Sequence, residues 1–180
     1  MLKRWRRLGS SIAHRNPWWT VRRDTALLPS GAEAEYYSVE TPGSVMIIPI
    51  DAAGCFVCVR QYRFLNERES LEFPGGGMRD GQDAHAAAAA ELAEEAGLAG
   101  ELRAIGSFNP FNGVTSELCH VFVARALVPA SAEPDATEEF LCEHLTADAF
   151  DAAVADGTLW DGMTLAAHRL YLAWRARTAL

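Results

Sequence analysis

The stretch 75–98 constrains the fold of this chain most: three consecutive glycines, a short polar turn, and an alanine-rich segment that ends in glutamates. Asp83 is suited to cap the N-terminus of a helix, and the alanines that follow it have high helix propensity. Gly97 stands where a helix C-cap favours a positive φ. The pattern predicts a helix over residues 84–96, preceded by a glycine turn that interrupts regular structure.

Three glutamates, Glu91, Glu94 and Glu95, lie near the end of this helix. Their spacing of three and four residues places them on one face, where they repel one another. They also meet the negative end of the helix dipole, which costs roughly 0.3–1 kcal/mol for each exposed charge. A solvated acidic face is one interpretation. Because the adjacent glycines allow a phosphate to approach, we favour a site for Mg²⁺ or Mn²⁺, held by carboxylates, a loop carbonyl and water.

Composition limits the classes of partner. The 180 residues are enough for one domain with a real core, and the formal net charge is −8. Such a charge argues against non-specific nucleic-acid binding and requires local cations if the substrate is a polyanion. We also expect no membrane span, because no apolar run approaches the roughly 18 residues that a span needs.

The four cysteines do not predict a metal site. Cys55 and Cys58 lie in a strand-like run, and residues three apart in a strand point to opposite faces. Cys119 and Cys142 also fall in strand-like runs. We therefore expect four buried thiols in a reducing cytoplasm.

The remaining sequence predicts strands followed by helices. The basic residues 1–15 are expected to form a solvated tail or a short helix rather than a nucleic-acid arm. Residues 16–42 predict a β-hairpin that turns at Pro29-Ser30-Gly31. Further strands are expected over 45–50, 55–62, 102–108, 119–126 and 140–145, and helices over 147–155 and 164–176. This order favours an α+β sandwich over a parallel doubly wound sheet.

The central stretch resembles the signature of the Nudix hydrolase family, G-x5-E-x7-R-E-U-x-E-E-x-G-U, in which U is a bulky aliphatic residue. The matching positions are Gly76, Glu91, Leu92, Glu94, Glu95, Gly97 and Leu98. Gln82 stands where the family has Glu, and Ala90 where it has Arg. The resemblance implies a Nudix-type α/β/α sandwich with a mixed sheet, and hydrolysis of a diphosphate bond.

Residues 16–175 are similar to the ADP-ribose pyrophosphatase branch of that family. The similar segments are Pro29-x-Gly31, Glu35-Tyr36-Tyr37, Arg60-Gln61-Tyr62-Arg63, Glu72-Phe73-Pro74-Gly75, Thr137-Glu138 and 161–167. In that branch the N-terminal hairpin builds a homodimer whose substrate site draws on both subunits. We therefore expect a basic extension over 1–15 and a single Nudix domain over 16–180, with the hairpin used for dimerisation.

The resemblance also implies roles for the acidic residues. Glu91 and Glu95 are expected to bind the metal ion, with the backbone carbonyl of Gly75. Glu94 is counted with the catalytic carboxylates. The general base is expected in the late acidic loop, at Glu138 or Glu139, with Glu138 ranked narrowly first.

Candidates for substrate contacts are basic and aromatic. Arg60 and Arg63 have the planar guanidinium that suits a diphosphate, but their spacing places them on opposite strand faces. We expect at most one of them to reach the substrate directly and the other to have a structural role. Trp18, Trp19 or Tyr36 could stack on a nucleobase. Packing in a dimer core is the equal alternative for each of them.

Three functions remain open from the sequence. The first is metal-dependent hydrolysis of ADP-ribose or a related nucleoside diphosphate sugar. The second keeps the chemistry but acts on a nucleoside triphosphate or a dinucleotide. The third is a Nudix-fold nucleotide-binding module with little catalysis, which the departures at Gln82 and Ala90 motivate.

Overall fold

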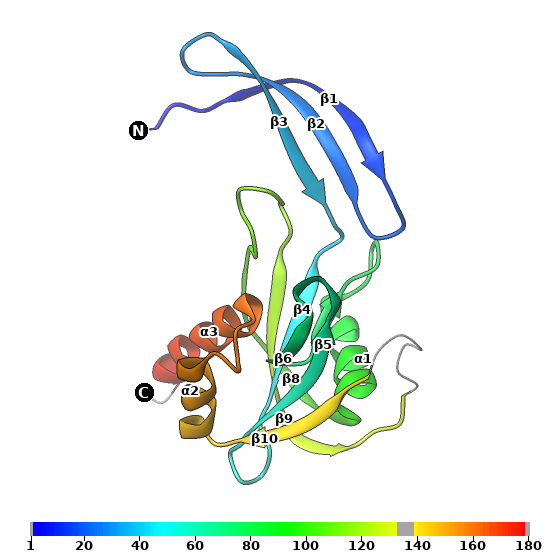
Figure 1. Cartoon of the computed structure of the whole chain (residues 1–180), viewed down its shortest axis with the longest axis vertical. Coiled ribbons are helices and arrows are strands. Elements are labelled where there is room, and N and C mark those ends of the chain that lie inside the picture. The colour runs from blue at the N-terminus through cyan, green and yellow to red at the C-terminus, as the bar shows by residue number, and fades with distance from the viewer. Residues whose placement is uncertain (1, 133–138, 179–180) are drawn as a thin grey trace. The chain divides into compact units, whose positions relative to one another are not determined.

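The structure is a computed structural model that describes residues 2–132 and 139–178 (Figure 1). The chain forms two compact units. The first, here the N-terminal unit, contains Met1–Pro42 and Asn109–Leu118; the second, the main unit, contains Gly43–Phe108 and Cys119–Leu180. The predicted division into 1–15 and 16–180 remains a prediction.

The N-terminal unit contains a three-stranded antiparallel sheet of β1 (Arg6–Arg15), β2 (Thr20–Leu27) and β3 (Glu33–Glu40), in the order β1-β2-β3. The predicted hairpin is confirmed as β2 and β3. The tail or short helix expected over the first fifteen residues is wrong for β1. Every residue of β1 is exposed, and its sequence lacks the apolar alternation that marks a half-buried strand. Its backbone pairing with β2 defines it instead.

An ion pair between a buried aspartate and an exposed arginine joins β1 to the rest of this sheet. Asp24 on β2 is buried, and its Oδ2 lies 2.8 Å from Nη2 of Arg7 on β1. The loop of residues 109–118 packs on β3, where the Tyr36 hydroxyl donates to the carbonyl of Gly113 (2.7 Å). Polar contacts therefore hold much of the N-terminal unit together.

The main unit contains two sheets and three α-helices. The strands are β4 (Ser44–Pro49), β5 (Phe56–Arg63), β6 (Arg68–Glu72), β7 (Gly75–Gly77), β8 (Leu98–Phe108), β9 (Cys119–Pro129) and β10 (Leu141–Leu145). The helices are η1 (Phe64–Asn66), α1 (Ala84–Ala96), α2 (Ala147–Asp156) and α3 (Gly162–Thr178). One sheet has the order β7-β4-β9-β8 and the other β10-β5-β6. Because β4 and β9 are parallel and the other pairs antiparallel, the predicted α+β fold with a mixed sheet is confirmed.

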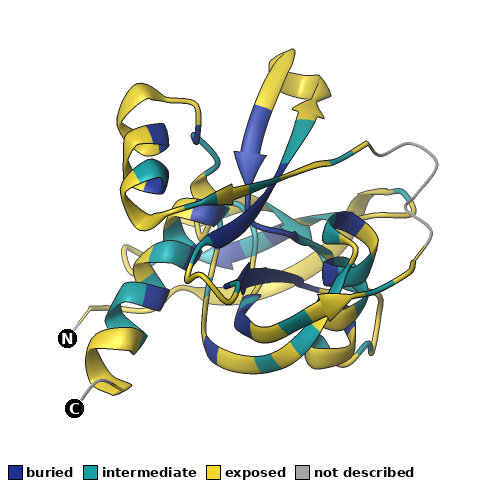
Figure 2. Ribbon diagram, turned by 90° about the horizontal axis from the view of Figure 1, so that it is seen from below, coloured by how far each residue is buried: buried dark blue, intermediate teal, exposed yellow. Residues whose placement is uncertain are grey.

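Strand β4 divides the core into two layers. All six of its residues are buried. Val45 and Ile47 pack with Leu92 of α1, whereas Met46 and Ile48 belong to the cluster that holds residues of α2 and α3. Alternate side chains of a strand point to opposite faces, so this strand fixes helices on both sides of the sheet. Figure 2 shows buried residues concentrated in the strands and on the inner helix faces.

Local predictions differ in outcome. The helix over 84–96 and both of its caps are confirmed. The glycine turn is wrong in one respect, because Gly75–Gly77 pairs with β4 as a short strand. None of the four cysteines forms a disulfide bond. Their predicted burial is confirmed for two and wrong for Cys142, which is exposed, and Cys55, which is partly exposed. Among the helices that the structure describes, none is both long and apolar enough to span a membrane.

His168 on α3 lies in the aromatic part of the core. Its ring centroid is 4.4 Å from that of Phe150 and 5.4 Å from that of Phe56. Burial lowers the pKa of His168, and the nearby charge of Arg175 acts in the same direction, while that of Asp151 opposes it. The folded protein therefore holds this imidazole in its neutral form.

We expect the free energy of unfolding to fall as the pH drops below about 6.5, the usual pKa of histidine in an unfolded chain. The unfolded chain then binds a proton that folded His168 resists, so this stability is present above that pH and is lost as the pH falls through the lowered pKa. Denaturation with urea between pH 8 and pH 5 should show a smaller loss in His168→Phe than in the wild type. Equal losses would contradict this account.

Candidate active site

Helix α1 presents its negative end to the site. Asp83 caps its first turn, with Oδ1 accepting from the backbone N–H of Ala86 (2.9 Å), and Gly97 ends it with a φ of 63°. The last turn, which is described in full, contains no Lys or Arg. The glutamates there have no basic residue of the same helix turn to offset the dipole.

Two of the three glutamates face strand β7. Glu95 is only 8% exposed, and its Oε2 accepts a hydrogen bond from the backbone N–H of Gly75 (2.9 Å). The carboxylate of Glu91 lies against Gly76, where an added Cβ would be 2.5 Å from Glu91 Oε1. Glu94 is exposed. The structure thus places Glu91 and Glu95 at the glycine strand and leaves Glu94 on the surface.

The glycines of β7 permit this close approach. Met46 and Gly75 are register partners in the β4–β7 pair. A Cβ on Gly75 would lie 2.3 Å from the carbonyl oxygen of Val45, a distance that real side chains do not adopt. Glycine at 75 and 76 therefore lets the strand lie between β4 and the carboxylates of α1.

Arg63, at the end of β5, is held by a buried carboxylate. Its Nε donates to Oε1 of Glu72 (2.7 Å) and its Nη2 to Oε2 of the same group. Glu72 is 3% exposed and also accepts from Nε2 of Gln61 (3.4 Å). The hydrogen bond to Glu72 raises the pKa of Arg63, and the charges of Glu72, Asp161 and Glu95 add to that effect. This fork orients the guanidinium in a field of acidic groups.

Arg60 has different partners. Its Nε donates to Oε1 of Glu143 on β10 (2.5 Å), and its Nη1 lies 3.5 Å from Oε2 of Glu69 on β6. The two arginines therefore pair with different carboxylates, consistent with the opposite faces expected from their spacing. The role of either in substrate binding remains a prediction.

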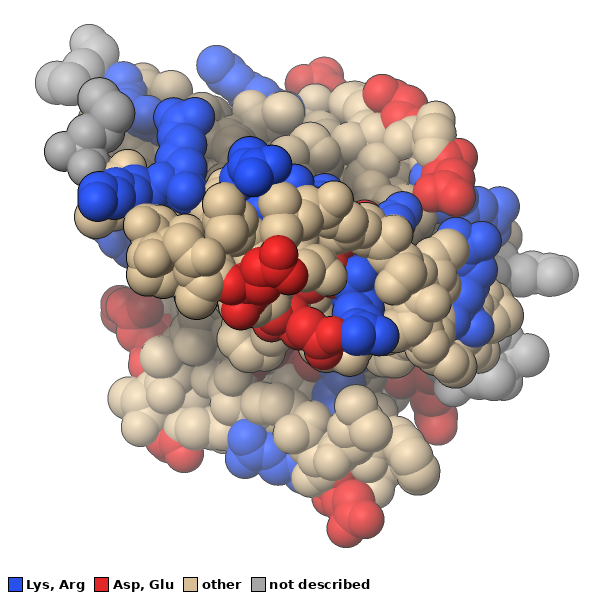
Figure 3. Space-filling model, turned by 90° about the horizontal axis from the view of Figure 1, so that it is seen from above, with Lys and Arg blue, Asp and Glu red and all other residues tan. Residues whose placement is uncertain are grey.

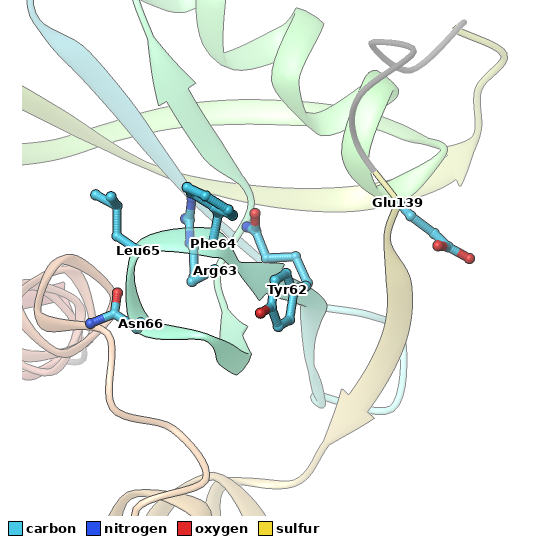
Figure 4. A pocket seen from close by; sticks show the side chains of 7 residues that line it. Tyr62, Arg63, Phe64, Leu65, Asn66 and Glu139 are labelled. Atoms are coloured by element: carbon cyan, nitrogen blue, oxygen red, sulfur yellow. The ribbon is translucent and has the colours of Figure 1, made fainter.

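A pocket of about 570 Å³ opens beside Arg63. The described residues that line it are Gln61, Tyr62, Arg63, Phe64, Leu65, Asn66 and Glu139. Figure 4 shows Tyr62, Arg63, Phe64, Leu65 and Asn66 at the end of β5 and in the turn after it, while Glu139 comes from the segment before β10. Arg60 is absent from this described lining. Glu138, ranked first as the general base, lies outside the described residues.

The acidic residues at β7 suit a divalent cation in donor type. Carboxylate oxygens are the donors that Mg²⁺ and Mn²⁺ take in proteins. The carboxylate of Glu91 lies in the space that a side chain at position 76 would fill. Within residues 2–132 and 139–178, no group of three or more His, Cys, Asp or Glu side chains is arranged to enclose a metal ion. An ion here would need water or substrate oxygens to complete its coordination, which is common for Mg²⁺.

Local sequence patterns assign no role to Glu72. The available signal was a charged residue between Leu71 and Phe73, both of which are buried. A hydrogen bond holds the backbone beside it, since the N–H of Phe73 donates to Oγ1 of buried Thr164 (3.0 Å). Such a contact joins positions 91 residues apart, so no local pattern predicts it.

The remaining candidates have local roles in the structure. Gln82 accepts from the N–H of Arg79 (2.9 Å) and so stabilises the turn before α1. In the N-terminal unit, Trp18 and Trp19 donate their backbone N–H groups to Oδ1 of Asn16 (2.9 Å each). The ring of Tyr36 packs edge-on with that of Trp5. Nucleobase stacking by these aromatic residues remains a prediction.

Family models match both the N-terminal part and the larger remaining part of the chain. Residues 40–160 match the model of the NUDIX domain, and residues 5–39 match that of the nucleoside diphosphate sugar hydrolase N-terminal domain. An ADP-ribose pyrophosphatase of Bacillus subtilis (strain 168) is 34% identical over 101 residues, which are 56% of this chain and 55% of that protein.

A second relative is a CMP-5'-(N-acetyl-N-hydroxy-3-aminopropyl)phosphonate hydrolase of Streptomyces rubellomurinus (strain ATCC 31215). It is 28% identical over 122 residues, which are 67% of this chain and 59% of that protein. The matches thus span less than two thirds of these relatives' own length. The crystal structure of an ADP compounds hydrolase has the same fold, with a TM-score of 0.86 and 22% identity over 99% of this chain and 97% of that one. Since the NUDIX domain model covers more than half of its length, the chain belongs to the Nudix family.

Proposed function

We propose that this protein hydrolyses the diphosphate bond of ADP-ribose or a related nucleoside diphosphate sugar. The observation that carries the proposal is the placement of Glu91 and Glu95 against two consecutive glycines of β7. Acidic side chains at the negative end of a helix, beside exposed backbone, suit a cation and a phosphate better than they suit helix stability. The NUDIX domain match over residues 40–160 supports the same reaction class.

Glu91 and Glu95 would hold the divalent ion, for which we propose Mg²⁺, with Mn²⁺ as the alternative. When bound, such an ion supplies charge neutralisation at the diphosphate and makes a water molecule more acidic. The hydrogen bond from Gly75 orients one oxygen of Glu95, and the absence of a side chain at position 76 leaves room for the carboxylate of Glu91. These residues therefore orient their carboxylates before any ligand arrives.

Arg63 would orient the substrate, because its guanidinium lines the pocket and can form a fork with phosphate oxygens. Glu139 lines the same pocket. As an exposed carboxylate it can accept the proton of the attacking water, and Glu138 is the alternative base in the same loop. Glu94 is exposed, so we propose an accessory role for it in drawing cations to the site.

A second substrate class has one observation in its favour. The relative from Streptomyces rubellomurinus is named for hydrolysis of a CMP-linked phosphonate. A site that recognises mainly the two phosphorus centres would accept such a compound, since phosphoryl transfer depends on positioning and charge neutralisation. We rank this substrate below ADP-ribose, because the relative named ADP-ribose pyrophosphatase has the higher sequence identity to this chain.

We further propose a homodimer in which the N-terminal sheet contacts a second copy of the chain. Residues 1–42 carry seven Lys or Arg and four Asp or Glu, whereas the other residues carry nine and twenty. Opposite net charges favour contact between the N-terminal unit of one copy and the main unit of another. Exposed aromatic side chains, including Trp18 (76% exposed) and Trp19, offer apolar area for it. The face drawn in Figure 3 carries both Lys and Arg and Asp and Glu side chains, with uncharged surface between them.

The four cysteines form no disulfide bond, which supports a cytoplasmic location.

The function is tested by product analysis with a panel of nucleotides in Mg²⁺. We expect AMP and ribose 5-phosphate from ADP-ribose. Glu95→Gln should lower kcat by roughly 100-fold or more, the size typical of removing a group that stabilises charge in the transition state. Glu101→Gln, at an exposed position of β8, is the matched control and should retain activity. Turnover of triphosphates alone, or tight binding without turnover, would contradict the proposal.

Gly76→Ala tests the metal site without removing a carboxylate. The added Cβ displaces the Glu91 carboxylate, which can rotate away, so the thermal unfolding temperature should change little. The affinity for Mn²⁺, measured by calorimetry, should fall about 10- to 100-fold, as when a supporting contact of a metal ligand is lost. Gly77→Ala is the control, because nothing lies within 4 Å of its added Cβ. Equal Mn²⁺ affinities in the two variants would refute the assignment.

The dimer is tested by analytical ultracentrifugation. We expect a dimer whose dissociation constant rises with salt, because the opposite net charges of the two surfaces are screened. Trp18→Ala together with Trp19→Ala should shift the protein toward monomer. A monomer at all concentrations of the wild type would exclude the homodimer.

A further inference from the structure

The ion pair of Arg63 with Glu72 presents a conflict for a phosphate site. Both oxygens of the Glu72 carboxylate accept from Arg63. The side chain of Glu72 is buried whereas that of Arg63 is 44% exposed, so leaving Glu72 without this partner would strand a buried charge, which is costly. A phosphate that approaches Arg63 must therefore compete with an anion that is already in place.

The electrostatic surroundings reinforce that competition. The charges of Asp161 and Glu95 also act on Arg63. The negative charges that act on Arg63 thus include Asp161 and Glu95 in addition to its hydrogen-bonded partner Glu72, although this arginine lines the pocket. An anion gains little from Arg63 in such a field unless a cation first offsets the carboxylates.

We propose that Glu72 is an internal counter-anion that keeps Arg63 from binding phosphate groups until a divalent cation lies against Glu91 and Glu95. This inference rests on the proposed function, since it assumes that Arg63 contacts the diphosphate. The positive charge of the cation offsets the nearby carboxylates and weakens their attraction for Arg63. The guanidinium then directs some of its N–H groups to the phosphate oxygens of the substrate. Cation binding precedes anion binding, so metal-free protein does not trap free phosphate compounds.

The same strand provides a comparison pair. Arg60 pairs with Glu143 at 2.5 Å and joins β5 to β10. If the pair of Arg63 with Glu72 only joined β5 to β6, its removal would resemble removal of the pair at Arg60. An effect on anion binding at one pair and not at the other separates the proposed role from a structural one.

The test is calorimetric binding of inorganic pyrophosphate in EDTA, without any metal. Glu72→Gln keeps the size of the side chain and its capacity to accept a hydrogen bond but removes the charge. We expect it to bind pyrophosphate about tenfold more tightly than the wild type, which corresponds to about 1.4 kcal/mol. The gain should disappear when Arg63→Ala is added. Glu143→Gln should bind as the wild type does.

Unchanged or weaker binding by Glu72→Gln would overturn the proposal, as would an equal gain in Glu143→Gln. A second measurement uses the wild type alone and so does not depend on whether the variant folds. Mg²⁺ without any anion should accelerate hydrogen exchange of the Arg63 Nε–H, followed by NMR, and an unchanged rate would also overturn it. Failure of the proposed function would appear separately, as an absence of ADP-ribose hydrolysis.

Discussion

The close approach of the glycine strand to the end of α1 is the contact on which the site depends. Glycine at 75 and 76 removes the side chains that would otherwise push β7 away from β4 and from Glu91. The backbone N–H of Gly75 then satisfies a carboxylate oxygen of nearly buried Glu95. Burying a carboxylate without such a donor is costly. The glycines thus make room for the acidic residues and also supply a donor for one of them.

The core keeps this contact in place. Alternate residues of β4 pack toward α1 on one side and toward the cluster of α2 and α3 on the other. Leu92, one residue after Glu91, is 1% exposed and lies in the cluster with Val45 and Ile47. Packing of that leucine sets the rotation of α1 about its own axis, and the rotation decides which glutamates face β7. The exposure of Glu94 follows from the same rotation.

Features with a local cause could be predicted from the sequence. The ends of α1 were predicted correctly because Asp83 and Gly97 act on the backbone within a turn of the helix. Strands β1, β6 and β7 were missed because their pairing partners, and not their own composition, define them. The partnership of Glu72 with Arg63 and the contact of Phe73 with Thr164 depend on the folded arrangement, so residue spacing could not reveal them.

The parallel pairing of β4 with β9 has a consequence for folding during synthesis. Ser44–Pro49 aligns with residues 119–124, so the ribosome must synthesise all the residues between these two strands before the central sheet can close. The hairpin of β2 and β3 involves only nearby residues and can form much earlier. Nascent chains would therefore contain a formed N-terminal hairpin while apolar β4 still lacks its parallel partner β9. An exposed strand of this kind is prone to aggregation, and chaperones protect it at this stage.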